Sequence, residues 1–219
     1  MVISRKEIQD IYKNRAKRYD FYSRLFWLVG FRYSSYRAHA IELLRLKRGD
    51  CVVELGCGTG LNFPMLMERI GPEGKIIGVD LTSEMLACAQ EKVQQSRWNN
   101  VELVQSDMAN YEFPGAINGV LSTGAFGFVP EYEQVIAAAS RALIPGSRLV
   151  ILDMKRSDQW PSWLFNIVVW IGRPFGATHE YYKRRPWKSV ERLFPDAAFE
   201  QKYAGLIYFS SGTASSLAA

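Results

Sequence analysis

The stretch VVELGCGTG at residues 52–60 constrains the fold of this 219-residue chain more than any other feature. It begins with the apolar, β-branched pattern of a buried strand, and three alternate glycines follow at once. Glycine lets the backbone turn sharply and approach a ligand at positions where a Cβ atom would clash. The pattern therefore predicts a strand, a ligand-binding turn and a helix behind it. A purely structural junction between strand and helix would use the same glycines.

The spacing of these glycines narrows the kind of ligand. They read G-x-G-x-G, and Leu61 stands where a dinucleotide-binding G-x-G-x-x-G fingerprint has its last glycine. The turn therefore does not require a phosphate group on its ligand.

Two further apolar stretches end in acidic residues. Residues 75–79 are followed by Asp80, and residues 101–105 are followed by Ser106, Asp107 and Met108. A carboxylate at a strand end can accept hydrogen bonds from both hydroxyls of a ribose, whereas capping of the next helix is the alternative role for Asp80. Asp107 and Met108 offer an acid for the edge of an adenine and an apolar surface for its face. The glycine turn and the two acids therefore predict an adenosine-containing ligand.

With these features in this order, the chain resembles the class I S-adenosylmethionine (SAM) dependent methyltransferases from about residue 19 to its C-terminus. The resemblance implies that SAM is the cofactor and S-adenosyl-L-homocysteine the product. It implies a cofactor site made of Glu54, Gly56, Cys57, Gly58, Gly60, Asp80, Leu81, Asp107, Met108 and Ser122. In this set Cys57 is interpreted as a small buried residue, and Ser122 as part of the floor below the sulfonium. Residues 122–126, STGAF, lack the histidine that many relatives carry at the end of the fourth strand.

Alternating strand and helix patterns after residue 50 predict a mostly parallel sheet. The resemblance implies the α/β fold class in detail: a single-domain, Rossmann-like, class I methyltransferase fold with seven strands and a closing antiparallel hairpin. Helices are expected near residues 4–20, 34–47, 61–70, 83–95 and 131–143, and strands near 51–55, 75–79, 101–105, 118–122 and 147–153. Residues 144–146 predict a turn before the fifth strand. One domain is expected over residues 1–219, with a helical substrate-entrance segment at 1–48 and a cap or membrane-interface insert at 154–186.

Cysteine content and the N-terminus bear on where the protein acts. Cys51, Cys57 and Cys88 form no complete disulfide framework and lie at no metal-ligand spacing. The first residues become charged at once and contain no apolar secretory core. We therefore expect a cytoplasmic protein without a metal, as a monomer or a homodimer.

Positive charge gathers in two segments. Residues 1–24 hold seven Lys or Arg against three Asp or Glu, and residues 155–192 hold eight against three, in a chain whose net charge is only +5. Each segment flanks an apolar, aromatic run that contains Trp27 in the first case and Trp160, Trp163 and Trp170 in the second. Tryptophan beside apolar and basic residues predicts peripheral binding to an anionic membrane. A lid over the cofactor or a dimer interface is the alternative, and nucleic acid is not expected because the runs are aliphatic as well as aromatic.

The entrance sequence RAKRYD at residues 15–20 is similar to that of the lipid-acting branch of the family, which includes quinone C-methyltransferases and N-methyltransferases of phosphatidylethanolamine and betaine lipids. The phrase GCGTGLNFP and the Trp-rich insert resemble the lipid N-methyltransferases more closely. This resemblance implies a phospholipid N-methyltransferase that acts on phosphatidylethanolamine. Methylation of a quinone carbon or of another small molecule, and a SAM-binding scaffold without turnover, stay open as alternatives.

Methyl transfer depends on positioning, but an amine must also lose a proton before it attacks. Tyr19, Asp20 and His179 are the candidate bases, whereas His39 falls in the middle of a predicted helix and is interpreted as structural. Aromatic faces would hold a quaternary ammonium product.

Overall fold

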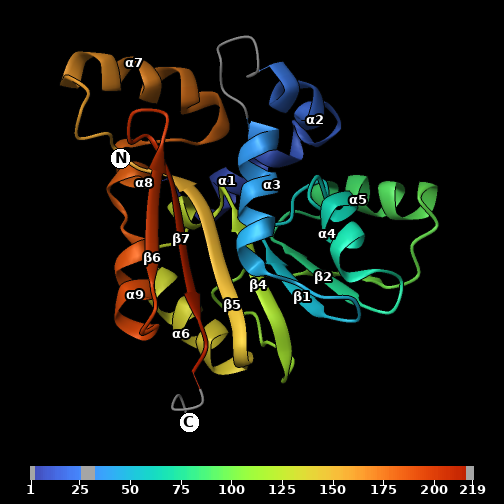
Figure 1. Cartoon of the computed structure of the whole chain (residues 1–219). Coiled ribbons are helices and arrows are strands. Elements are labelled where there is room, and N and C mark those ends of the chain that lie inside the picture. The colour runs from blue at the N-terminus through green and yellow to red at the C-terminus, as the bar shows by residue number, and fades with distance from the viewer. Residues whose placement is uncertain (1–2, 26–32, 216–219) are drawn as a thin grey trace.

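The computed structural model describes residues 3–25 and 33–215 (Figure 1). Trp27 and most of the apolar run around it fall in residues 26–32, outside the described ranges, so the expectation attached to that run is not addressed by the structure.

A seven-stranded sheet forms the centre of the molecule, in the order β3-β2-β1-β4-β5-β7-β6 (Figure 1). The strands are β1 (Cys51–Leu55), β2 (Lys75–Asp80), β3 (Val101–Gln105), β4 (Ile117–Thr123), β5 (Leu143–Met154), β6 (Ala198–Lys202) and β7 (Ile207–Thr213). Strands β1 to β5 pair in parallel, and β7 pairs antiparallel with both β5 and β6. The predicted fold class is confirmed, including the closing hairpin.

Helices cover both faces of the sheet because adjacent strand residues point to opposite sides. Val52 packs with α3 (Tyr33–Leu44), α4 (Phe63–Ile70) and α5 (Ser83–Gln95). Its neighbour Val53 faces the other cluster, with α6 (Tyr132–Ala142) and α9 (Pro186–Leu193). Parallel strands buried on both faces leave their carboxyl ends as the place where polar side chains can meet a ligand.

The prediction of one continuous N-terminal helix over residues 4–20 is wrong. The chain forms α1 (Arg5–Lys13) and α2 (Ala16–Leu25), separated by Asn14 and Arg15. The amide of Arg15 donates to the carbonyl of Tyr12, which is the tighter spacing that ends an α-helix. The third helix also ends early, at Leu44, because Arg45 adopts a positive φ of 54°.

The turn predicted at residues 144–146 is a bulge inside β5. The register on β4 shifts between Ile117 and Gly119, and Gly146 takes a φ of 85° while its amide donates to the carbonyl of Ala214. Glycine supplies a conformation that other residues rarely adopt, so the strand continues through the irregularity instead of ending there.

The insert after β5 forms a cap over the carboxyl ends of the strands. It contains α7 (Ser162–Gly172), the short η3 (Arg173–Phe175) and α8 (His179–Lys183). Phe165, Val169, Tyr181, Tyr182 and Leu206 form its own buried cluster. Within the described residues, no helix has both the length and the apolar content needed to cross a bilayer.

Candidate active site

The glycine turn after β1 lies against the end of β2. The amides of Gly56 and Cys57 both donate to the carbonyl of Val79, at 2.8 and 3.0 Å. Gly56 has a φ of 70°, and a Cβ atom there would lie 2.4 Å from the Cβ of Ala125. The turn therefore requires glycine at this position for both its conformation and its close approach to the segment after β4.

Asp80 fixes the same turn from the end of β2. Its Oδ2 accepts a hydrogen bond from the amide of Gly58 at 2.8 Å, and its Oδ1 accepts one from the amide of Thr82 at 2.9 Å. Burial raises the pKa of the Asp80 carboxyl, and these backbone hydrogen bonds oppose that effect. Each oxygen keeps a lone pair, so Asp80 holds the turn and still has acceptors for a ribose.

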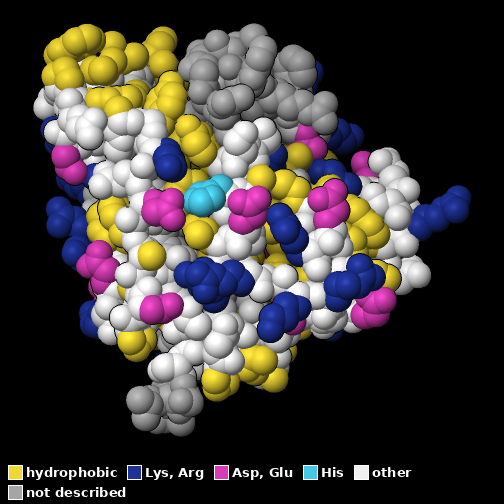
Figure 2. Space-filling view, in the orientation of Figure 1, with side chains coloured by type: hydrophobic (Ala, Val, Ile, Leu, Met, Phe, Trp, Pro, Cys, Tyr) yellow, Lys and Arg dark blue, Asp and Glu magenta, His cyan; other side chains and the backbone are white. Residues whose placement is uncertain are grey.

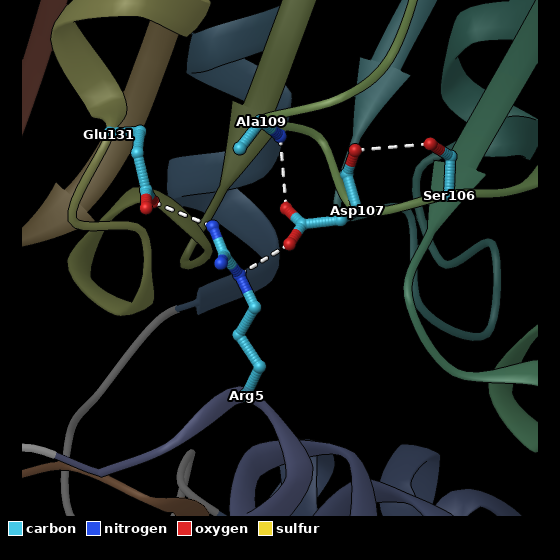
Figure 3. Close-up of polar contacts among 5 residues, drawn as sticks. All are labelled: Arg5, Ser106, Asp107, Ala109 and Glu131. Carbon is cyan, nitrogen blue, oxygen red and sulfur yellow. Dashed lines mark hydrogen bonds and ion pairs between the residues drawn. The ribbon is translucent and has the colours of Figure 1, made fainter.

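Asp107 lies at the far end of the same cavity, where the N-terminal helix reaches it. Its Oδ1 accepts a hydrogen bond from the amide of Ala109 at 2.9 Å, and its Oδ2 pairs with Nε of Arg5 (Figure 3). Arg5 also pairs with Glu131 at 2.7 Å, so it bridges two acids from separate elements. Helix α1 thereby covers the cavity at the place predicted for the adenine.

One acidic and one basic side chain near the turn each have a buried hydrogen-bonding atom without a partner among the described residues. Glu54 accepts a hydrogen bond from Nδ2 of Asn62 at 2.6 Å, but its Oε2 is buried without a partner among the described residues. Burial raises the pKa of Glu54 to about 8, against the lowering effects of Asn62 and the Arg37 charge. Nε of Arg37 is likewise buried and without a hydrogen bond in the described part of the chain. Both atoms lie behind the lining of the two cavities, in the packing around the turn.

Asp20, on α2, binds the glycine turn on the side away from the cavity lining. Its Oδ1 accepts a hydrogen bond from Oγ1 of Thr59 at 2.5 Å, and its Oδ2 lies 3.3 Å from Nζ of Lys92. Lys92 also donates to the carbonyl of Thr59 at 2.9 Å. Helices α2 and α5 are thus joined through the turn, which gives Asp20 a positioning role in this structure.

A second, more apolar cavity adjoins the first. The two share Tyr12, Tyr19, Gly124 and Phe128. The remaining lining residues of the second cavity are Tyr33, Met154, Val168, Ile171, Gly172, Phe175, Ala177, Tyr181, Tyr182 and Leu206. We call the first the cofactor cavity and the second the acceptor cavity, after the roles argued below.

A buried acid supports one wall of the acceptor cavity. Asp153, at the end of β5, accepts hydrogen bonds from the amides of Gly127 and Met154 at 3.0 and 2.7 Å, and from the hydroxyl of Tyr181. Burial raises the pKa of Asp153 to about 6, although these hydrogen bonds favour its charged form. The ring of Tyr181 lies on Gly127, where a Cβ atom would come within 2.2 Å of it. Asp153 and Tyr181 thereby connect the cap to the sheet.

The predicted site residues fall into two groups in the structure. The cofactor cavity is lined by Gly56, Gly58, Asp80, Leu81, Asp107 and Met108, and Tyr19 lies on the boundary between the two cavities. The lining does not include Glu54, Cys57, Gly60, Ser122, Asp20 or His179.

The residues outside the lining have other contacts. Gly60 and buried Cys57 shape the turn, and the hydroxyl of Ser122 donates to the carbonyl of Leu55 at 2.9 Å, so Thr123 and Gly124 face the cavity instead. His179 is exposed on α8, with its ring 5.9 Å from that of Phe165, and the structure does not bring it to either cavity. His39 lies 3.1 Å from Glu200 on the outer side of α3.

Sequence reasoning missed Arg5 and Tyr12 of α1, Arg37 of α3, and Asp153. Asp153 follows an apolar strand in the same way as Asp80, so the signal was present for that residue. The others lie on helices whose docking depends on tertiary packing.

Comparisons with known proteins agree with this geometry. The family model described as a methyltransferase domain matches residues 52–146. A demethylmenaquinone methyltransferase of Listeria welshimeri is 30% identical over 209 residues, which cover 87% of this chain and 87% of that protein. The structure of a SAM-dependent methyltransferase from Aquifex aeolicus matches with a TM-score of 0.56 at 21% identity, over 77% of this chain and 84% of that one.

A further solved structure is that of geranyl diphosphate C-methyltransferase from Streptomyces coelicolor, in complex with S-adenosyl-L-homocysteine. It matches with a TM-score of 0.66 at 16% identity, over 83% of this chain and 79% of that one. Likeness at this level of identity shows the shared fold.

Proposed function

Because this chain belongs to the class I SAM-dependent methyltransferases, we propose that it methylates a ring carbon of a lipid-soluble quinol that resembles a demethylated menaquinol. The acceptor cavity carries this proposal. Its wall is almost wholly aromatic and aliphatic, and it meets the cofactor cavity at Tyr19 and Gly124. The 30% identical relative named demethylmenaquinone methyltransferase supports the same acceptor class.

The N-terminal segment (residues 1–48) and the insert (residues 154–186) supply most of the acceptor side. Tyr12, Tyr19 and Tyr33 come from the first, and Val168 and Tyr181 come from the second. We propose that these two segments bind the acceptor and belong to the same single domain as the cofactor cavity. Flat rings pack well against the aromatic side chains of such a cavity, with offset or edge-to-face contacts.

When bound, SAM supplies an electrophilic methyl group on a sulfonium. The chain holds the acceptor ring beside that group and excludes water, and such positioning lowers the barrier by up to roughly 7–11 kcal/mol in favourable cases. A quinol attacks through carbon more readily once its hydroxyl is deprotonated. We infer that this proton passes to the oxygen of Tyr181 as the hydroxyl proton of Tyr181 passes to the Asp153 carboxylate. The methyl–sulfur bond would break as the bond from the ring carbon to the methyl group forms, and the ring would become aromatic again when that carbon loses its hydrogen as a proton.

The membrane is the natural source of such an acceptor, and α7 supports peripheral binding to it. Trp163 and Trp170 of this helix are 65% and 69% exposed, and Figure 2 shows hydrophobic side chains gathered over it. Arg156, Arg173 and Lys183 are exposed nearby in the sequence. Flotation with vesicles should show binding that increases with anionic lipid and falls with salt, because attraction is about 1 kcal/mol per basic residue and is screened.

The acceptor is tested by incubating the purified protein with labelled SAM and three lipids in mixed micelles. These are a prenylated demethylnaphthoquinol, the fully methylated naphthoquinol as its matched control, and phosphatidylethanolamine. We expect label only in the demethylnaphthoquinol. Replacing Tyr181 by Phe keeps the ring on Gly127 but removes the hydroxyl, and should lower turnover roughly 10²-fold with little change in SAM affinity.

Phosphatidylethanolamine is a second candidate because several tyrosine faces surround the cavity, and such faces hold ammonium groups. Label in this lipid and none in the quinol would transfer the proposal to N-methylation. No label in either lipid, together with SAM binding, would leave the acceptor outside both classes.

A further inference from the structure

Helix α7 has two apolar faces with different environments. Phe165 and Val169 are buried in the cap, while Val168 and Gly172, four residues apart, line the acceptor cavity. On the opposite side, Trp163, Ile167 and Trp170 are spaced by four and three residues, so they share one exposed face. The helix therefore stands as a wall between the acceptor cavity and the outside of the molecule.

Ile171 lies at the edge of α7, between the acceptor cavity and the molecular surface. It lines the acceptor cavity and is still 51% exposed, so it lies at the rim where the cavity meets the surface. Beside it, Gly172 has no side chain, and a Cβ atom there would lie 2.8 Å from the Cβ of Ala177. The end of α7 is thus closely packed on its inner side and open next to Ile171.

We propose that the apolar tail of the acceptor leaves the cavity past Ile171 and stays in the bilayer while its head reaches the methyl group. This deepens the proposed function and rests on the acceptor being a lipid. The exposed face of α7 would lie at the level of the acyl chains, which places the rim of the cavity at the membrane surface. The acceptor then needs no transfer of its whole tail through water.

Exposed basic side chains of the insert fit an anionic lipid surface. Arg173 follows the helix directly and is exposed, and Arg156 places its guanidinium over the Phe165 ring, 5.5 Å from the ring centre. Lys183 and Arg185 are exposed at the end of α8, with Glu180 as the described acid bonded to Lys183 at 2.8 Å. Basic side chains that flank an exposed tryptophan face are the arrangement by which helices lie in a membrane interface.

The test uses photolabelling, which requires no turnover. The full chain is mixed with vesicles of phosphatidylglycerol and phosphatidylcholine that contain a prenylated naphthoquinone with a diazirine in its first prenyl unit, beside the ring. Phosphatidylethanolamine with a diazirine in its acyl chain is used in parallel. After irradiation, mass spectrometry locates the label. We expect label on the outer residues Trp163 and Trp170 from both probes, and on Val168 and Phe175 inside the cavity from the quinone probe alone.

A bulky side chain at the rim separates entry from simple docking. Ile171→Trp should reduce the labelling of Val168 and Phe175 about tenfold, because an indole in place of the Ile171 side chain would fill the opening beside it. Ile167→Trp is the matched control on the exposed face and should leave the labelling unchanged. Label on the outer face alone, or equal cavity labelling in both variants, would overturn the proposal. If Ile171→Trp blocks the cavity labelling but none of the lipids offered is methylated, the route past Ile171 would stand and the proposed acceptor would be rejected.

Discussion

The cofactor cavity and the acceptor cavity share Tyr19 and Gly124, but different forces shape them. Backbone amides bonded to fixed acceptors define the cofactor cavity, with Gly58 on Asp80 and Gly56 on the carbonyl of Val79. In the acceptor cavity, packed rings define the walls. The ring of Tyr181, for example, lies edge to face with that of Tyr182 at 4.9 Å and beside that of Phe128 at 4.7 Å.

Because of this difference, the two cavities should respond differently to amino-acid substitutions. A backbone turn with a positive φ tolerates no added Cβ atom, whereas a wall of side chains can adjust its rotamers around a substituted residue. Single-atom changes should therefore have large effects on the cofactor side and smaller, acceptor-specific effects on the other side.

Of the single substitutions compared under one condition, Gly56→Ala should produce the largest effect. The alanine would have to adopt a φ of 70°, and its Cβ would lie 2.4 Å from the Cβ of Ala125. Backbone strain and overpacking would therefore both destabilise the folded state. We expect a loss of about 3 kcal/mol in the free energy of unfolding, measured in urea. The matched control is Gly115→Ala, at a position where a Cβ meets nothing within 4 Å, and it should change stability by less than about 1 kcal/mol.

A double variant sharpens this prediction. Ala125→Gly removes the contacting Cβ, so Gly56→Ala in that background should lose only the conformational part of its cost. Equal losses in the two backgrounds would mean that the contact with Ala125 contributes nothing.

Asp80→Ala should have the next largest effect, on SAM affinity. It removes the acceptors for the ribose and frees the amide of Gly58, and a hydrogen bond to a charged group contributes about 1.5–3 kcal/mol. Calorimetry should show the Kd for SAM rising at least tenfold. Glu68→Ala, which removes an exposed carboxylate that lines neither cavity, is the control. Unchanged affinity in Asp80→Ala would remove this residue from the cofactor site.

The same contrast explains how much the sequence predicted. The strands, the glycine turn and the two strand-end acids were identified because one short segment carries each of them, and its backbone makes the contacts. The lining residues Gly56, Gly58, Asp80 and Asp107 follow from those segments.

The acceptor side was predicted less well because it has no contiguous motif. Tyr33, Phe175 and Leu206 meet only after α3, the cap and the strand hairpin have packed. The exposed His179 shows the same limit, since its position two residues before Tyr181 does not bring it to the cavity. The break between α1 and α2 was missed because Asn14 and Arg15 interrupt an otherwise helical pattern without Gly or Pro.

The third prediction concerns pH and Glu54. Its pKa is about 8 in the folded protein, against about 4.3 in an unfolded chain. The folded state therefore keeps a proton that the unfolded state has released, and the stabilisation present below about pH 4.3 is lost as the pH rises to 8.

Urea unfolding of the ligand-free protein between pH 5 and 8 measures this effect. Stability of the wild type should fall relative to Glu54→Gln by up to about 1.4 kcal/mol per pH unit. Gln keeps an oxygen for the amide of Asn62, so the comparison isolates the charge. Parallel pH profiles of the two proteins would contradict the assignment.

The smallest effect is expected at the boundary itself, where Tyr19 lines both cavities. Burial raises the pKa of its hydroxyl, so at neutral pH Tyr19 is a hydrogen-bond donor rather than a base. Tyr19→Phe keeps the ring contact with Tyr12, at 6.0 Å between centroids, and removes only the donor. If the hydroxyl holds an oxygen of the acceptor, turnover should fall about fivefold, the effect of one hydrogen bond of about 1 kcal/mol, while the Kd for SAM stays unchanged. Tyr132→Phe, which lines neither cavity, is the matched control. A weaker Kd for SAM with unchanged turnover of the bound enzyme would instead assign the Tyr19 hydroxyl to the cofactor and move the boundary between the two halves toward α7.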